Sequence, residues 1–67
     1  MIEQRKLKDL ILKRIKSLNG GSITALYVSI ETNECIEFVS DILNEMVNDG
    51  DISKTWHNNR IRYFVEV

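Results

Sequence analysis

Apolar residues recur every three or four positions in the first part of the chain, which is the spacing of an amphipathic helix. The pattern extends over residues 2–18 and is formed by Leu7, Leu10, Ile11, Ile15 and Leu18. The segment Asn19-Gly20-Gly21 follows directly, and glycine accepts the left-handed backbone that commonly ends a helix. We therefore predict a first long helix from Ile2 to Leu18.

The next apolar run is too short for its periodicity to decide between a helix and a buried strand. It spans Ala25–Ile30 and follows Ser22-Ile23-Thr24. Threonine caps helix N-termini through its hydroxyl, so Thr24 is a candidate N-cap, and Ser22-Ile23 suits a short extended pair. We predict a short strand at Ser22-Ile23 and a short helix from Ala25 to Ile30.

A second long helical pattern occupies the middle of the chain and is formed by Ile36, Val39, Leu43, Met46 and Val47. Thr32 and Asn33 precede it and are candidate N-caps. Glu34 and Glu37 lie in the predicted first turn, where carboxylates suit the positive end of the helix dipole. The segment Asn48-Asp49-Gly50 ends the pattern, which predicts the third helix of the chain.

The last segment alternates between two faces, as a β-hairpin does. On its first strand, one face carries Ile52, Lys54 and Trp56. On its second strand, one face carries Ile61, Tyr63, Val65 and Val67, and the opposite face carries Arg60, Arg62, Phe64 and Glu66. The turn between the strands is predicted at His57-Asn58-Asn59, because asparagine tolerates the positive φ that hairpin turns need.

The chain has 67 residues, 43% hydrophobic and 28% charged, which predicts one small globular domain over residues 1–67 rather than disorder. One cysteine and one histidine form neither a disulfide nor a zinc site, so we expect no cofactor and a reducing, cytoplasmic setting. The sequence has no apolar run near the roughly 18 residues of a membrane span. It also lacks a glycine-rich phosphate loop and an acid–base pair, so we expect neither an enzyme nor a small-molecule substrate.

The predicted order of helix, short helix, long helix ending at a glycine, and hairpin resembles the winged-helix domain, a helix-turn-helix variant whose hairpin is the wing. The most specific stretch runs from Val39 through Gly50 to Ile52 and looks like the end of a recognition helix entering the first wing strand. Ile23-Thr24 lies where the family has a short first strand and the start of its second helix. The resemblance implies an α+β fold and DNA binding, with the third helix in the major groove and the wing on the adjacent backbone or minor groove.

The formal net charge of −1 conceals three blocks of alternating sign. Residues 1–18 carry +4, residues 19–51 carry −7 without any Lys or Arg, and residues 52–67 carry +2. Together with the resemblance, the basic first helix and wing favour double-stranded DNA as the partner of a transcriptional regulator or nucleic-acid accessory factor. We expect DNA to be contacted through the first helix and the wing, and the wing residues expected to contact it are Lys54, His57, Asn58, Asn59, Arg60 and Arg62.

The third helix is poorly suited to the usual docking mode, because carboxylates repel phosphate oxygens. The polar residues of this region that can still read bases are Asn33, Ser40 and Asn44. A second hypothesis is a protein-interaction module that docks a basic partner or mimics DNA charge through four acids, Glu34, Glu37, Asp41 and Glu45. The structural alternatives are a solvated helix face for the acids and a charge-protected edge hairpin for the wing.

Two aromatic residues of the hairpin allow two interpretations. Phe64 is predicted on the strand face of Arg60 and Arg62, away from the core, and Trp56 lies near the turn. An exposed aromatic ring beside arginines suits base stacking or a protein-binding hot spot. Alternatively, the two rings cover each other across the hairpin.

Two residues of the first helix depart from its pattern. Arg14 falls inside the apolar stripe, and we expect it to snorkel or to pair with a carboxylate. Leu12 projects onto the charged face with Ile2 nearby, which predicts a second contact surface. Because the core is small, this leucine favours a homodimer or a protein partner that contacts Leu12.

Overall fold

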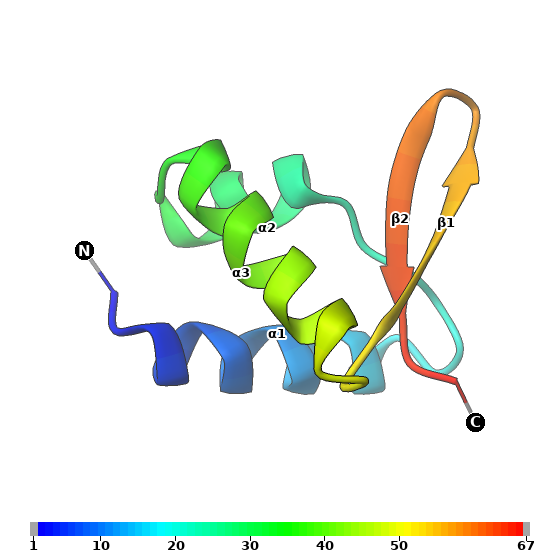
Figure 1. The fold of residues 1–67 in the computed structure, drawn as a ribbon, viewed down its shortest axis with the longest axis horizontal. Coiled ribbons are helices and arrows are strands. Elements are labelled where there is room, and N and C mark those ends of the chain that lie inside the picture. Colours follow the sequence, from blue (N-terminus) through cyan, green and yellow to red (C-terminus); the bar gives the residue numbers. More distant parts are fainter. Residues whose placement is uncertain (1, 67) are drawn as a thin grey trace.

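Three helices and then a hairpin follow one another in the order that the hydrophobic pattern predicts (Figure 1). This computed structural model describes residues 2–66, so the predicted strand position Val67 lies outside the described residues. The elements are α1 Gln4–Ser17, α2 Ala25–Thr32, α3 Ile36–Asn48, β1 Ser53–His57 and β2 Arg60–Phe64. The arrangement confirms the predicted α+β fold class, and it is winged-helix-like, with the hairpin in the place of the wing.

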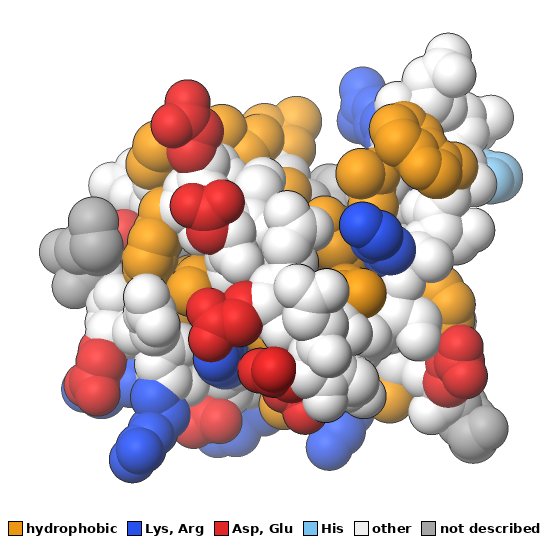
Figure 2. Space-filling model, in the orientation of Figure 1, with side chains coloured by type: hydrophobic (Ala, Val, Ile, Leu, Met, Phe, Trp, Pro, Cys, Tyr) orange, Lys and Arg blue, Asp and Glu red, His pale blue; other side chains and the backbone are white. Residues whose placement is uncertain are grey.

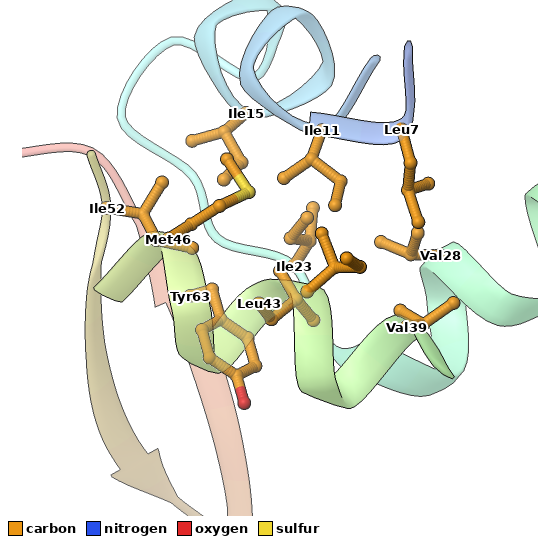
Figure 3. Packing of buried hydrophobic residues seen from close by; sticks show 11 residues of the cluster. Leu7, Ile11, Ile15, Ile23, Val28, Val39, Leu43, Met46, Ile52 and Tyr63 are labelled. Atoms are coloured by element: carbon orange, nitrogen blue, oxygen red, sulfur yellow. The ribbon is translucent and has the colours of Figure 1, made fainter. Parts of the chain in front are cut away.

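The core forms where α1 packs against α3, and α2 and the hairpin close it (Figure 3). Its buried side chains are Leu7, Ile11 and Ile15 of α1, Val28 of α2, Val39, Ile42, Leu43 and Met46 of α3, and Ile23, Ile52 and Tyr63. No charged or other polar residue is buried within residues 2–66. The fold therefore depends on apolar packing for its stability. None of the described helices combines the length and hydropathy that crossing a membrane requires.

The segment between α2 and α3 differs from the prediction. Thr32 belongs to α2, where its hydroxyl donates to the Val28 carbonyl at 2.7 Å. Asn33 ends α2 with a left-handed φ of 57°, which asparagine tolerates. Cys35 precedes α3, and its side chain makes no capping hydrogen bond. The predicted N-caps of α3, Thr32 and Asn33, are therefore wrong, because both residues complete the preceding helix.

A short bridge joins the segment before α2 to the hairpin. Ile23 and Tyr63 exchange two backbone hydrogen bonds, of 2.9 and 2.7 Å, which confirms the predicted extended residues near Ser22-Ile23. The Thr24 hydroxyl accepts from the Tyr27 amide at 3.1 Å, so Thr24 is the predicted N-cap of α2. Burial raises the pKa of the Tyr63 phenol, because desolvation disfavours the phenolate. Backbone pairing and core packing thus both attach the hairpin to the helices.

The hairpin reverses direction in a two-residue turn. β1 and β2 are antiparallel, and His57 pairs with Arg60. The turn therefore contains only Asn58 and Asn59, whose φ values are 52° and 64°, and the predicted inclusion of His57 is wrong. Positive φ at both central residues is the requirement of the type I′ turn, whose twist matches that of the flanking strands. The asparagine pair is thus the local reason for the reversal.

Leu43→Ala removes a fully buried side chain between α1 and α3, and we expect it to lower the free energy of unfolding by about 2–5 kcal/mol. Ile30→Ala shortens a side chain of α2 that is 72% exposed, and we expect a change below about 0.5 kcal/mol. Urea unfolding followed by circular dichroism measures both. Equal destabilisation by the two variants would contradict the burial of Leu43 and the exposure of Ile30.

Candidate partner-binding surface

Most of the wing residues predicted to contact DNA gather around the hairpin turn. Lys54, His57, Asn58, Asn59 and Arg60 are all exposed. Figure 1 shows the turn at the end of the hairpin that lies away from α1. The tip of the hairpin therefore presents two cations and three further polar side chains to solvent.

Arg62, the remaining wing residue, contacts the domain itself. Its side chain is half-buried, its Nε donates to the Ser22 hydroxyl at 2.6 Å, and its Nη2 donates to the Ser22 carbonyl at 3.2 Å. These bonds connect β2 to the segment before α2. The guanidinium of Arg62 thus helps to attach the hairpin to the segment before α2. Arg62 is therefore not one of the exposed residues at the hairpin tip.

Apart from Ile36, the exposed side chains of α3 are acidic or uncharged polar groups. Glu37, Asp41, Asn44 and Glu45 are exposed, and α3 contains no Lys or Arg. Figure 2 shows acidic side chains following α3 across the front of the domain. Within residues 2–66, Glu37 and Asp41 form no ion pair. We call Glu37, Asp41 and Glu45 the acidic face, and it lies where the winged-helix resemblance implies a DNA-reading surface.

Two of the four acids predicted for docking make contacts inside the domain. Glu45 Oε1 accepts from Lys8 Nζ at 2.8 Å, and this hydrogen bond raises the pKa of Lys8. Glu34 lies before α3, is half-buried, and accepts from the Ile2 amide at 3.0 Å through Oε2. The prediction of Glu34 in the first turn of the helix is therefore wrong. Its carboxylate holds the N-terminal segment and is no part of the acidic face.

The cations of α1 are separate from those of the hairpin tip. Arg14 pairs with Glu31, which confirms the expected carboxylate partner. On the face shown in Figure 2, basic side chains lie along α1 and on the hairpin, with the acidic side chains of α3 between them. The two basic segments therefore form no continuous patch on this face. The exposed cations left on α1 are Arg5, Lys6, Lys13 and Lys16.

Leu12 does not lie on the charged face of α1 as its projection predicts. Leu12 and Ile2 are both half-buried and pack against the core. The apolar side of α1 extends beyond its fully buried residues, because half-buried residues at the edge of the small core also pack against it. The predicted placement of Leu12 on the charged face is therefore wrong, and its role as a dimer or partner contact stays a prediction.

Trp56 and Phe64 lie on opposite faces of the hairpin. Trp56 pairs with Ile61 and Phe64 pairs with Ser53, and alternation places residues an odd number apart on different faces. The interpretation in which the two rings cover each other is therefore wrong. Trp56 shares the face of the buried Tyr63 but is itself 70% exposed, because the tip of the hairpin extends beyond the core.

A groove of about 450 Å³ separates the outer half of the hairpin from the helices. Leu26 of α2 and Ser40 of α3 line one side, and Trp56, Arg60 and Ile61 line the other. This volume lies within the range of roughly 300–1,000 Å³ that is typical of binding pockets. Ser40, predicted as a base-reading residue, thus lies in the groove, whereas Asn44 lies beside the acidic face and Asn33 caps α2.

The sequence-based prediction misses three exposed apolar side chains of the helices. Leu26, Ile30 and Ile36 are 47%, 72% and 43% exposed. Val28 is the buried residue of α2, and Leu26 and Ile30 are each two residues from it, about 200° around a helix. A projection centred on Val28 predicts their outward position. If the segment is interpreted as a strand, this outward position is not predicted, because a strand puts residues 26, 28 and 30 on the same face.

Residues 2–66 contain no group of three or more His, Cys, Asp or Glu side chains that could hold a metal ion. Cys35 is free and exposed at the start of α3. Comparison of the chain with known protein families, with curated proteins and with solved structures finds no match. Functional inference therefore rests on the arrangement of the hairpin tip, the acidic face and the groove.

Arg62→Ala removes both hydrogen bonds to Ser22, and we expect it to lower the free energy of unfolding by about 1–3 kcal/mol. Arg60→Ala removes an exposed side chain of the same strand, and we expect a change within about 0.5 kcal/mol. Thermal and urea unfolding of the two variants separate these effects. A larger loss for Arg60→Ala than for Arg62→Ala would refute the structural role of Arg62.

Proposed function

We propose that this chain is a winged-helix protein-interaction module that docks a basic protein partner on the acidic face. The observation that carries the proposal is the composition of this surface. Glu37, Asp41 and Glu45 are exposed, and α3 has no Lys or Arg. Lys8 of α1 pairs with Glu45 alone, which leaves the charges of Glu37 and Asp41 without an ion-pair partner among the described residues. The one cysteine, Cys35, is exposed and free, which supports work in the reducing cytoplasm.

Electrostatics at this surface favour a cationic partner over a phosphate backbone. Glu37 and Asp41 are four residues apart on α3, about 6 Å along the helix axis, which is shorter than the Debye length of about 8 Å at physiological salt. Their fields therefore add. DNA gains affinity when Lys or Arg displaces its counterions, and the acidic face has neither residue. A basic protein instead gains association rate and selectivity from complementary charge.

A lysine/serine peptide, which is basic but has no apolar side chain, is expected to bind the chain in a salt-sensitive manner. We expect the double variant Glu37→Gln/Asp41→Asn to weaken binding about five- to tenfold, because two exposed charge contacts together contribute about 1 kcal/mol. Asp9→Asn is the matched control, since Asp9 is an exposed acid of α1. Isothermal titration calorimetry at low and physiological salt measures the affinities. Equal binding by the double variant and the control would contradict the proposal.

A second candidate function is binding of double-stranded DNA through the wing, as in a transcriptional regulator or an accessory factor. Lys54 and Arg60 favour it, because both are exposed near the turn of the hairpin. Arginine on a hairpin tip is suited to a narrow minor groove or to a phosphate. With only two cations at the tip, few counterions are released, so the expected binding is weak and strongly salt-dependent.

Fluorescence anisotropy of a labelled random duplex at about 50 mM salt, where phosphate contacts are strong, tests this second function. Lys54→Ala/Arg60→Ala is expected to abolish binding. Lys13→Ala/Lys16→Ala removes the same charge from exposed positions of α1 and is expected to retain it. Absence of binding by the unaltered chain would exclude the candidate, and loss with the α1 pair alone would reject the wing as the contact.

A further inference from the structure

Exposed apolar side chains lie around the groove beside the hairpin as well as in its lining. Leu26 forms part of one wall, and Ile30 follows it one turn along the same side of α2. Trp56, on the opposite wall, is 70% exposed. Ile36 lies one turn before Ser40, the residue of α3 in the groove. Clustered apolar side chains on a small domain mark an interaction site more often than single ones do.

Tryptophan on one wall and leucine on the other are the anchors of this surface. Trp56 presents a large, rigid ring, the side-chain type most enriched among residues that dominate binding energy. It stands on the hairpin face that also carries Ile61 and the buried Tyr63. A ligand seated between Trp56 and Leu26 would thus cover apolar surface that water now contacts, which favours its binding.

Two acidic residues of α3 lie near Ser40 along the helix, although neither is part of the groove lining. Glu37 is three residues before Ser40 and Asp41 directly follows it, so the two carboxylates lie about 60° and 100° around the helix from the groove wall. Arg60 is the basic residue of the opposite wall. A ligand with apolar and cationic groups therefore fits in one orientation, with its cations toward α3 and away from Arg60.

A second copy of the chain is a poor match for this surface. The exposed cations of α1 are on a helix whose fully buried residues, Leu7, Ile11 and Ile15, face its own core. Its half-buried Leu12 packs against the core as well. The apolar side chains that α1 of another copy offers are the half-buried Leu10 and the exposed Leu18 at its C-terminal end, so this helix would bring mainly positive charge and little apolar surface to the groove.

We propose that the groove between α2, α3 and the hairpin receives apolar side chains of a lysine- or arginine-rich segment of another protein. Trp56 and Leu26 contact the apolar side chains, and Glu37 and Asp41 pair with the cations. The inference rests on the proposed function and adds to it the apolar part of the recognition. It places the partner segment along the length of the groove, where α3 supplies the charge and the hairpin supplies the aromatic ring.

Trp56 is the only tryptophan of the chain, so intrinsic fluorescence reports directly on the groove. An amphipathic leucine/lysine peptide is the probe, and lysine/serine and leucine/glutamate peptides are its comparators. We expect the leucine/lysine peptide to shift Trp56 emission to the blue and to bind at least about tenfold more tightly than either comparator, since burying one leucine contributes roughly 1.5–3 kcal/mol.

Leu26→Ser is expected to weaken the leucine/lysine peptide about tenfold and leave the lysine/serine peptide unchanged. Leu18→Ser is the matched control, because Leu18 is also an exposed leucine, 42% against 47%, but lies at the end of α1 outside the groove lining. Glu37→Gln/Asp41→Asn is expected to remove the salt dependence while keeping part of the blue shift. Unchanged circular dichroism spectra establish that each variant is folded.

Several outcomes would overturn the inference. If the lysine/serine peptide binds as tightly as the leucine/lysine peptide and Trp56 emission does not move, the groove is unused although the acidic face still docks a basic partner. If no cationic peptide binds, the proposed function fails as well. Equal binding of the leucine/glutamate peptide would reject the role of Glu37 and Asp41. A blue shift that grows with the concentration of the chain alone would assign the groove to a second copy.

Discussion

The packing of α1 against α3 determines which side chains of this small domain can meet a partner. Leu7, Ile11 and Ile15 of α1 are buried together with Leu43 and Met46 of α3, as Figure 3 shows from close by. Burying one side of α3 turns the opposite side to solvent. Because the buried side takes most of the apolar residues of α3, the exposed side keeps its carboxylates. The acidic face is thus a direct consequence of how the core is built.

The hairpin is attached to this core at its base and is free at its tip. The Ile23–Tyr63 bridge and the Arg62–Ser22 hydrogen bonds hold β2 near the start of α2. Beyond these contacts the strands continue to the asparagine turn, which carries Trp56 away from the packed residues. A groove remains between the outer hairpin and the helices because no side chain of the described residues fills it. The hairpin is thus held at its base and exposed at its tip.

Charge separation links the two candidate functions. Lys8 and Arg14 of α1 are paired with Glu45 and Glu31. These two ion pairs neutralise, within the domain, part of the positive charge of residues 1–18 and part of the negative charge of residues 19–51. These pairs are partly exposed and contribute little to stability, but they lower the charge that α1 offers to DNA. Glu37 and Asp41 keep their full negative field, which is why the acidic face carries the proposal and the wing carries the second candidate.

The order of α1, α3 and the hairpin was predictable because each has its own periodicity and a glycine or asparagine segment at its end or turn. The short helix α2 was predicted from its N-cap Thr24, because its apolar run is too short for its periodicity to decide. The polarity of α3 was predictable too, since all of its charged residues are acidic. The predictions differ from the structure at Glu34, at Leu12 and at the N-caps of α3. In each case the local sequence pattern is compatible with two structural arrangements. A carboxylate near a helix start suits either the helix dipole or a distant amide, and only contact with Ile2 decided between them.

The sequence by itself determined the two long helices, the hairpin, the apolar core stripe and the alternation of charge blocks, because these follow from residue spacing and composition. Tertiary structure alone decided which apolar residues stay in solvent. Val28 faces the core while Leu26 and Ile30 do not, and Trp56 stays exposed although its strand face is the buried one. The burial of a side chain depends on what lies opposite it in space. At the groove, the facing surfaces belong to helices and a hairpin that are distant from each other along the chain.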